Sequence, residues 1–279
     1  MNRLKFNLKL AVTYMILIVV SLIILLPIIW MILVSFQETY SVFVLQSWIP
    51  STLKNYVDAL TMQKGIFIRW MFNSAFVSGI TVIITLVVST LGGYGFARLN
   101  FRGRDILFTL YLSTIMIPFA TTMIPLLYLC KQFGLVNTYA GLILPACSNI
   151  IPTFWIRQYV KSLPIELEDA ARVDGCSEIQ VFTHVVFPLL KPSMGVIALY
   201  TLWNQWNALL WPVVIVQDMN MYTANLGLTL VTSEEHAQMA TNWGLSMALA
   251  LLTCLPLLIM FILFQKTFVK GLVMGALKA

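Results

Sequence analysis

The sequence predicts an all-α membrane protein whose single domain covers residues 1–279. Hydrophobic residues make up 59% of the chain and charged residues only 10%, whereas about 25% of the residues in a typical soluble domain are charged. In addition, six apolar runs are long enough to cross about 30 Å of hydrocarbon, which predicts six transmembrane helices. The predicted spans lie at about residues 10–36, 72–97, 106–130, 138–160, 193–217 and 244–265.

The first run follows a basic N-terminal stretch that contains Arg3, Lys5 and Lys9. It is longer than the apolar core of a signal peptide and no small-residue cleavage site follows it, so we expect it to remain as a membrane anchor. Prolines inside several of the runs, Pro27 of the first run among them, predict bends, because a proline leaves one backbone carbonyl without its helical partner.

The distribution of basic residues predicts the orientation of the spans. An even number of spans places both termini on one side of the membrane, and we expect that side to be the cytoplasm. Thirteen basic residues then lie inside and four outside, in agreement with the positive-inside rule. The inside residues are Arg3, Lys5, Lys9, Arg98, Arg102, Arg104, Arg157, Lys161, Arg172, Lys191, Lys266, Lys270 and Lys278, and the outside residues are Lys54, Lys64, Arg69 and Lys131. The net charge of +6 thus reflects topology, and we expect no nucleic-acid partner.

Residues 162–192, called the polar segment below, interrupt the apolar pattern. Five of the eleven acidic residues of the chain lie there, namely Glu166, Glu168, Asp169, Asp174 and Glu178. Pro164 suits the first turn of a helix, and Gly175 after Asp174 suits a left-handed cap at its end. Ser177 and Gln180 have the spacing of a capping box, which predicts a second short helix.

On this second helix Ile179, Phe182 and Val186 are predicted to share one face. Pro188 and Pro192 are predicted to break it before the next apolar run. The pattern of the polar segment therefore predicts two short helices joined by a turn.

Two interpretations of the polar segment are open: amphipathic helices that rest on the bilayer, or a docking element for another protein. Together with the adjacent Lys161, the bases Arg172 and Lys191 offset the five acids in part and leave residues 161–192 with a net charge of −2. Anionic lipid surfaces attract basic segments rather than acidic ones. The charge therefore favours a protein partner.

The polar segment also contains Asp169-Ala170-Ala171, then Gly175, and then Val185 and Phe187-Pro188. This pattern resembles the EAA loop of binding-protein-dependent ABC importer permeases, with Asp169 where the family usually has Glu. Further likeness to the sugar-permease, maltose-type branch lies at Tyr94–Arg98, Phe101–Arg104, Asn73-Ser74, Trp206-Asn207, Pro212 and 265–272.

The resemblance implies a type I ABC importer permease fold in a prokaryotic inner membrane, with a cytoplasmic coupling helix that inserts into a separate ATPase subunit. It implies four protein partners: a second homologous permease, two copies of the ATPase, and an extracytoplasmic solute-binding protein. Membrane lipid surrounds the spans, and ATP is used by the ATPase, so the chain itself needs no cofactor. The implied coupling residues are Glu168, Asp169, Ala170, Ala171, Asp174, Gly175, Phe187 and Pro188.

The residues themselves predict neither an enzyme nor a metal site. No phosphate-binding G-x-x-x-x-G-K-[ST] sequence occurs. His184 and His236 have no neighbours at ligand spacing, and no nucleophile–base pair stands out. We also expect no ionisable residue in the interiors of the spans, which argues against a self-sufficient proton-coupled carrier.

One polar cluster, Trp203-Asn204-Gln205-Trp206-Asn207, lies within the fifth predicted span. It either forms hydrogen bonds between helices or lines a solute pathway, with amides for hydroxyl groups and indoles for the apolar face of a sugar ring. The spans offer no positive charge, so we predict a neutral saccharide as the solute. The alternatives are a glycerol-phosphate importer, a secondary carrier, and a structural or assembly protein without a transport role.

Overall fold

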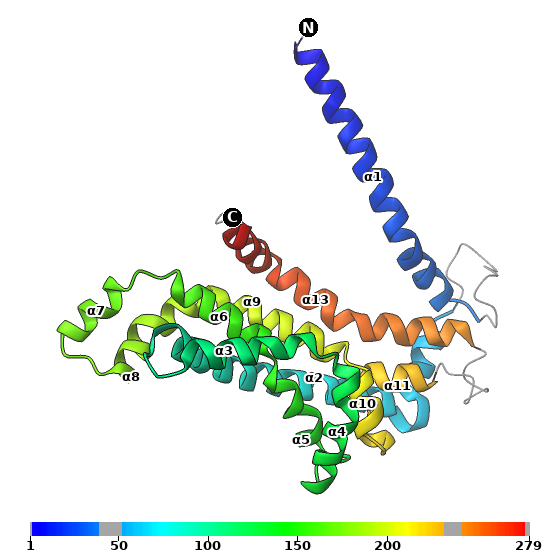
Figure 1. Ribbon diagram of the computed structural model, residues 1–279. Helices are drawn as coiled ribbons and strands as arrows, with labels where there is room; N and C mark the ends of the chain where they lie inside the picture. The colour runs from blue at the N-terminus through cyan, green and yellow to red at the C-terminus, as the bar shows by residue number, and fades with distance from the viewer. Residues whose placement is uncertain (1, 39–51, 232–241, 277–279) are drawn as a thin grey trace. The chain divides into compact units, whose positions relative to one another are not determined.

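The computed structural model describes residues 2–38, 52–231 and 242–276, and these residues form helices and turns without a strand (Figure 1). His236 and Lys278 lie outside the described residues. The contacts group the chain into two compact units: unit 1 comprises residues 1–68 and 227–256, and unit 2 comprises residues 69–226 and 257–279. A single domain over residues 1–279 stays a prediction.

Within the described ranges, four helices are long and apolar enough to cross a membrane. They are Leu10–Ser35 in α1 (Asn2–Ser35), α2 (Lys54–Arg98), the run Glu178–Trp206, and Trp243–Phe264 in α13 (Trp243–Ala276). Two further pairs of shorter helices are each bent at a break, and if each bent pair forms one span the described residues contain six spans. These helices agree with the multi-pass membrane protein that the apolar runs predict.

The bent pairs occupy the third and fourth predicted spans. In the first pair, α3 (Arg104–Ser113) and the 3₁₀ turn η1 (Thr114–Met116) meet α4 (Phe119–Gln132) at 105°. The bend falls at Ile117, which is extended because the following residue is Pro118. In the second pair, α5 (Tyr139–Ile143) and η2 (Pro145–Ser148) meet α6 (Ile150–Lys161) at 41°.

In unit 1, Asn55 joins the end of α1 to the beginning of α2. Its side chain is buried, and its amide nitrogen donates to the carbonyl oxygens of Ser35 (2.9 Å) and Gln37 (2.8 Å). A methyl group at Gly244, near the start of α13, would collide with the Gln37 carbonyl and the Asn55 amide. Glycine at this position therefore permits the close approach of α13.

In unit 2, the hydrophobic core lies where the ends of α2, α6 and α9 (Phe187–Trp206) meet the polar segment. Its buried members are Tyr94, Ala97, Ile156, Val160, Val181, Val186, Leu190 and Ile197. The polar segment contributes α7 (Glu166–Val173) and α8 (Glu178–Gln180) at this end. Figure 1 shows α10 (Leu210–Ile215) toward the opposite end of unit 2. η4 (Met219–Met221) follows it, and α11 (Ala224–Val231) has its first three residues in unit 2 and the others in unit 1.

The predicted helix break at Pro188 and Pro192 is wrong. The helix continues from α8 through a π-helical turn, η3 (Val181–Val186), into α9, which contains both prolines. A π-helical turn shifts the backbone hydrogen bonds by one residue, and the helix thereby accommodates the missing N–H of Pro188 directly after that turn. The continuous helix ends at Trp206, so the fifth predicted span, 193–217, is divided between α9 and α10.

The same π-helical turn alters which side chains face the core. Val186 is 1% exposed and Phe182 packs against the core, but Ile179 is 76% exposed. The predicted common face of the three residues is therefore wrong for Ile179, because a simple helical period does not hold across a π-helical turn.

The expected absence of ionisable residues from span interiors is wrong at Arg157, which lies within residues 138–160. Arg157 is 9% exposed in α6, and its guanidinium donates to the carbonyl of Phe96 (3.2 Å) and to Asp105 Oδ1 (3.1 Å). The guanidinium also lies 3.9 Å from the centroid of the Phe108 ring. These partners compensate the cost of burying its charge.

Candidate functional site

The polar segment begins with α7, whose C-terminal end is closed by Gly175. Gly175 has φ +88°, a left-handed conformation that favours glycine. The N–H of Cys176 donates to the Ala171 carbonyl and the N–H of Gly175 to the Arg172 carbonyl, both at 3.0 Å. This pattern is a Schellman motif and confirms the cap that the sequence predicts.

The second helix of the segment begins with the predicted capping box. Gln180 Oε1 accepts from the N–H of Ser177 at 2.8 Å, and Ser177 Oγ accepts from the N–H of Gln180 at 3.4 Å. The box satisfies two backbone donors that a helix start would otherwise leave unpaired. Together the two caps fix the short turn between α7 and α8.

The predicted coupling residues of α7 divide between its two faces. Glu168 and Ala171 turn inward: Glu168 is 1% exposed, and Ala171 packs against the hydrophobic core. Asp169 and Ala170 are exposed, and so are Asp174 and Gly175 in the following turn. The exposed residues form the outer side of the segment, and the inward residues attach α7 to the rest of unit 2.

The remaining two predicted coupling residues lie at the start of α9. Phe187 is 37% exposed, and its ring centroid lies 6.1 Å from that of Phe182, which packs on the core. Pro188 is exposed in the first turn of the helix. Phe187 therefore helps to hold η3 against the core, whereas Pro188 lies on the surface of the first turn of α9.

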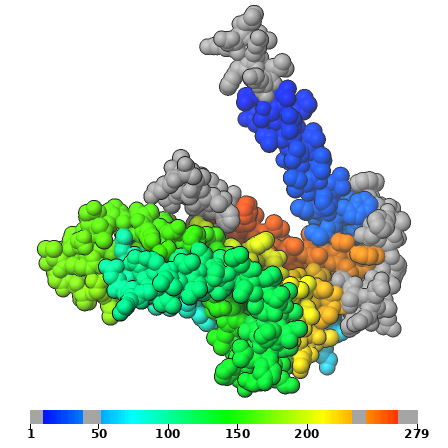
Figure 2. All heavy atoms as spheres, viewed as in Figure 1, coloured from blue at the N-terminus to red at the C-terminus, as the bar shows by residue number. Residues whose placement is uncertain are grey.

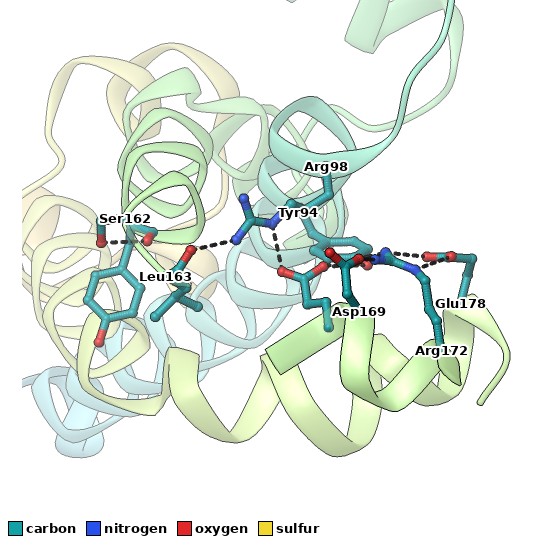
Figure 3. Close-up of polar contacts among 9 residues, drawn as sticks. Tyr94, Arg98, Ser162, Leu163, Asp169, Arg172 and Glu178 are labelled. Atoms are coloured by element: carbon teal, nitrogen blue, oxygen red, sulfur yellow. Dashed lines mark hydrogen bonds and ion pairs between the residues drawn. The ribbon is translucent and has the colours of Figure 1, made fainter. Parts of the chain in front are cut away.

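A buried ion pair holds α7 to the end of α2. The Nε of Arg98, the last residue of α2, donates to Glu168 Oε1 at 2.6 Å, and the two side chains are 10% and 2% exposed. Arg98 Nη2 also donates to the Leu163 carbonyl at 2.8 Å, and the Tyr94 hydroxyl lies 3.5 Å from Glu168 Oε2. Figure 3 shows Arg98 directed between Leu163 and α7.

Sequence reasoning missed this pair, because it assigned Arg98 to membrane topology and Glu168 to the docking surface. The two residues are 70 positions apart, and no local pattern indicates a contact over that separation. Loss of one partner from a buried pair costs about 3–5 kcal/mol when the other charge is left without compensation; here Arg172, 3.6 Å from Glu168 Oε2, offsets part of that cost if Arg98 is lost.

Arg172 connects α7 to α8. Its Nε and Nη2 donate to the two carboxylate oxygens of Glu178 at 2.8 and 3.1 Å, and its Nη1 donates to Asp169 Oδ1 at 2.8 Å (Figure 3). Hydrogen bonds to Glu178 and then to Asp169 raise the pKa of the Arg172 guanidinium above its ordinary value. Arg172 therefore stays charged and links the two short helices in one geometry.

Apolar side chains project from the outer side of the segment. Leu167 is 47% exposed, Val173 87% and Ile179 76%. Figure 2 shows the segment, in light green, as the exposed left-hand end of unit 2. An exposed surface of large apolar side chains among carboxylates is typical of a protein interaction site.

The cluster 203–207 lies at the end of α9, where the helix stops before α10. Trp203, Asn204 and Asn207 are exposed, whereas Trp206 is 5% exposed and Gln205 is half-buried. The side-chain nitrogens of Asn204 and Asn207 donate to the carbonyls of Tyr200 and Trp203, each at 2.8 Å. These bonds hold both amides against the helix, with three of the five side chains directed away from the core.

No group of three or more His, Cys, Asp or Glu within the described ranges is arranged to hold a metal ion. Instead, the fold and the site define a helical multi-pass membrane protein whose polar segment presents acidic and apolar side chains at one end of unit 2. Residues 89–272, which include the polar segment, match the family described as the binding-protein-dependent transport system inner membrane component. This match covers more than half of the chain, which therefore belongs to that family of transport subunits and is not an enzyme.

Individual relatives and one solved structure agree with this assignment. An arabinooligosaccharides transport system permease protein of Halalkalibacterium halodurans is 39% identical over 228 residues, which cover 81% of this chain and 80% of the relative. An sn-glycerol-3-phosphate transport system permease protein of Pectobacterium atrosepticum is 34% identical over 205 residues, 73% of this chain and 72% of the relative.

The solved structure is a bacterial ABC transporter involved in the import of the acidic polysaccharide alginate. It superimposes with a TM-score of 0.82 at 22% identity, and the alignment covers 93% of this chain and 96% of that one. This likeness confirms the importer permease fold that the sequence predicts.

Proposed function

We propose that the chain is a permease subunit of an ATP-driven importer for a neutral saccharide. In this proposal it forms half of the translocation pathway and pairs with a second, homologous permease. Two copies of an ATPase subunit bind the cytoplasmic side, and an extracytoplasmic binding protein delivers the solute. Both termini and the polar segment face the cytoplasm, as the distribution of basic residues predicts.

The observation that carries the proposal is the construction of the polar segment. Two caps, the Arg98–Glu168 pair and the Arg172 bonds make it rigid, and its outer side exposes Leu167, Val173 and Ile179. A surface that is preorganised in this way loses little conformational entropy when it binds a partner. An ATPase that docks there transmits its own movement to the helices that hold the segment.

The solute class rests on the end of α9. Residues 193–217 contain no charged side chain, so an anion next to Trp203 and Asn207 would lose its hydration without a counter-charge from this span. A neutral saccharide loses only hydrogen bonds, which exposed amides replace in part, and an indole covers its C–H face. The sugar named for the Halalkalibacterium halodurans relative supports this class, and the glycerol phosphate named for the other relative makes an anion the alternative.

Uptake into proteoliposomes tests the proposal. The chain is reconstituted with the candidate second permease and ATPase, and the loaded binding protein is added outside. We expect uptake of a neutral oligosaccharide only with ATP inside, and no competition by glycerol phosphate or by an acidic uronate oligosaccharide. Uptake driven by an ion gradient without the ATPase would contradict the importer, and preferred uptake of either anion would contradict the solute class.

A further inference from the structure

Glu168 differs from the other carboxylates of α7 in that it is buried, and its partner in α2, Arg98, has a side chain that is only 10% exposed. The other carboxylates of α7, Glu166 and Asp169, are exposed, as expected for a surface that a partner contacts. The Glu168 carboxylate instead points inward and meets Arg98 at 2.6 Å. A partner that docks on the outer side of α7 therefore does not reach this carboxylate.

We propose that the Arg98–Glu168 ion pair is the link through which movement of the polar segment reaches the transmembrane helix α2, and that both are positioning residues for coupling. This inference rests on the proposed function. It gives the pair a role separate from docking, which the exposed side of α7 performs.

The geometry of Arg98 supports this role. Arg98 is the last residue of α2, so a force on its guanidinium acts at the end of that helix. One side of the guanidinium binds α7 through Glu168, and the other binds the Leu163 carbonyl, between α6 and α7, at 2.8 Å. A planar guanidinium that makes both contacts at once fixes the orientation of α7 relative to α2.

Without the ion pair, the remaining apolar contacts would allow α7 to move relative to α2. Around the pair, α7 itself contributes only the small side chain of Ala171 to the hydrophobic core. Apolar contacts are not directional and permit sliding. Separation of α7 from α2 would instead leave Arg98 without its carboxylate, and Glu168 with only Arg172 of α7, 3.6 Å away, as a charged partner. The ion pair is therefore the contact that resists separation of α7 from α2.

The decisive variant replaces both partners by apolar residues, Arg98→Met with Glu168→Leu. Such a replacement of a buried pair leaves no lone charge and is often neutral for stability. The complex should therefore assemble and keep its basal ATP hydrolysis. Stimulation by the loaded binding protein should fall about tenfold, the usual size of a coupling free energy.

Two further variants sharpen the result. The exchanged pair, Arg98→Glu with Glu168→Arg, restores an attraction and should recover much of the stimulation, whereas Arg98→Glu alone should not. Arg104→Met is the matched control, because the hydrogen bonds and ion pair of the Arg104 side chain go to Leu99, Asn100 and Asp105, none of which belongs to α7. It should leave stimulation unchanged.

The outcomes separate this inference from the proposed function. Wild-type complex that shows no stimulation by the loaded binding protein would contradict the importer itself. If the wild type is stimulated and the apolar pair is stimulated equally, the link is disproved. Failure of the apolar pair to assemble would also overturn it, because the pair would then be required for folding rather than for coupling.

Discussion

The backbone of Gly93 in α2 packs directly against the side chain of Ile156 in α6. A methyl group on Gly93 would lie 2.5 Å from Ile156 Cγ2 and 2.6 Å from Ile156 Cβ. Ile156 is fully buried and belongs to the core beneath the polar segment. The close approach of α2 and α6 therefore depends on a glycine at residue 93.

We predict that Gly93→Ala lowers the free energy of unfolding by about 1–3 kcal/mol, since a packed interface has no room for the added methyl group. The thermal midpoint of the purified protein in detergent measures the change. Gly79→Ala is the control: no atom lies within 4 Å of a methyl group there, and alanine suits a helix better than glycine. An unchanged midpoint for Gly93→Ala would contradict the packing.

At the cap of α7, we predict that Gly175→Val reduces stimulated ATP hydrolysis while the protein still folds. No atom beyond the neighbouring residues lies within 4 Å of a Cβ added at this position, so the main cost is that of a left-handed backbone, about 1–2 kcal/mol for an L-residue. Asn adopts this conformation more readily than Val, and Gly175→Asn should therefore retain most of the stimulation. Equal loss in both variants would show that the backbone conformation is not the cause.

Thr81 in α2 offers a test of polar burial. It is 1% exposed, and its hydroxyl has no hydrogen-bond partner among the described residues. Thr81→Val should therefore raise stability by about 1 kcal/mol. Thr90 is the matched control, because its hydroxyl donates to the Leu86 carbonyl at 2.6 Å. A midpoint that falls more for Thr81→Val than for Thr90→Val would contradict this prediction.

At the end of α9, we predict different effects for exposed and buried members of the 203–207 cluster. Trp203→Ala and Asn207→Ala should each reduce uptake about five- to tenfold, because each removes a contact worth roughly 1–1.4 kcal/mol from the solute pathway. Trp206→Ala should chiefly reduce the amount of folded protein, since Trp206 is 5% exposed. Wild-type uptake by folded Trp203→Ala and Asn207→Ala would assign these residues to packing.

Local features of the polar segment could be predicted because their causes are local. The Ser177–Gln180 box and the Gly175 cap each depend on residues within one or two turns. The Arg98–Glu168 pair could not be predicted in this way, because its partners are far apart in the sequence.

The wrong predictions for helix faces and helix ends also have physical causes. The π-helical turn at Val181–Val186 leaves no signature that a regular helical period can detect. For this reason the predicted inward face of Ile179 and the predicted break at Pro188 are both wrong. The end of α9 at Trp206 lies inside an apolar run. Composition alone therefore predicts a span there but not the position where its helix stops.

Docking of the polar segment on an ATPase is most directly tested by cross-linking from Val173, which is 87% exposed. Val173→Cys carries a bifunctional thiol reagent in membranes that contain the whole complex, and the wild type controls for the native cysteines. Gln217→Cys is the matched control, because Gln217 is exposed two residues after α10, the helix that Figure 1 shows toward the opposite end of unit 2. We predict a product with the ATPase from residue 173 and none from residue 217. A product with the ATPase from residue 217, and none from residue 173, would contradict both the orientation and the docking role of the segment.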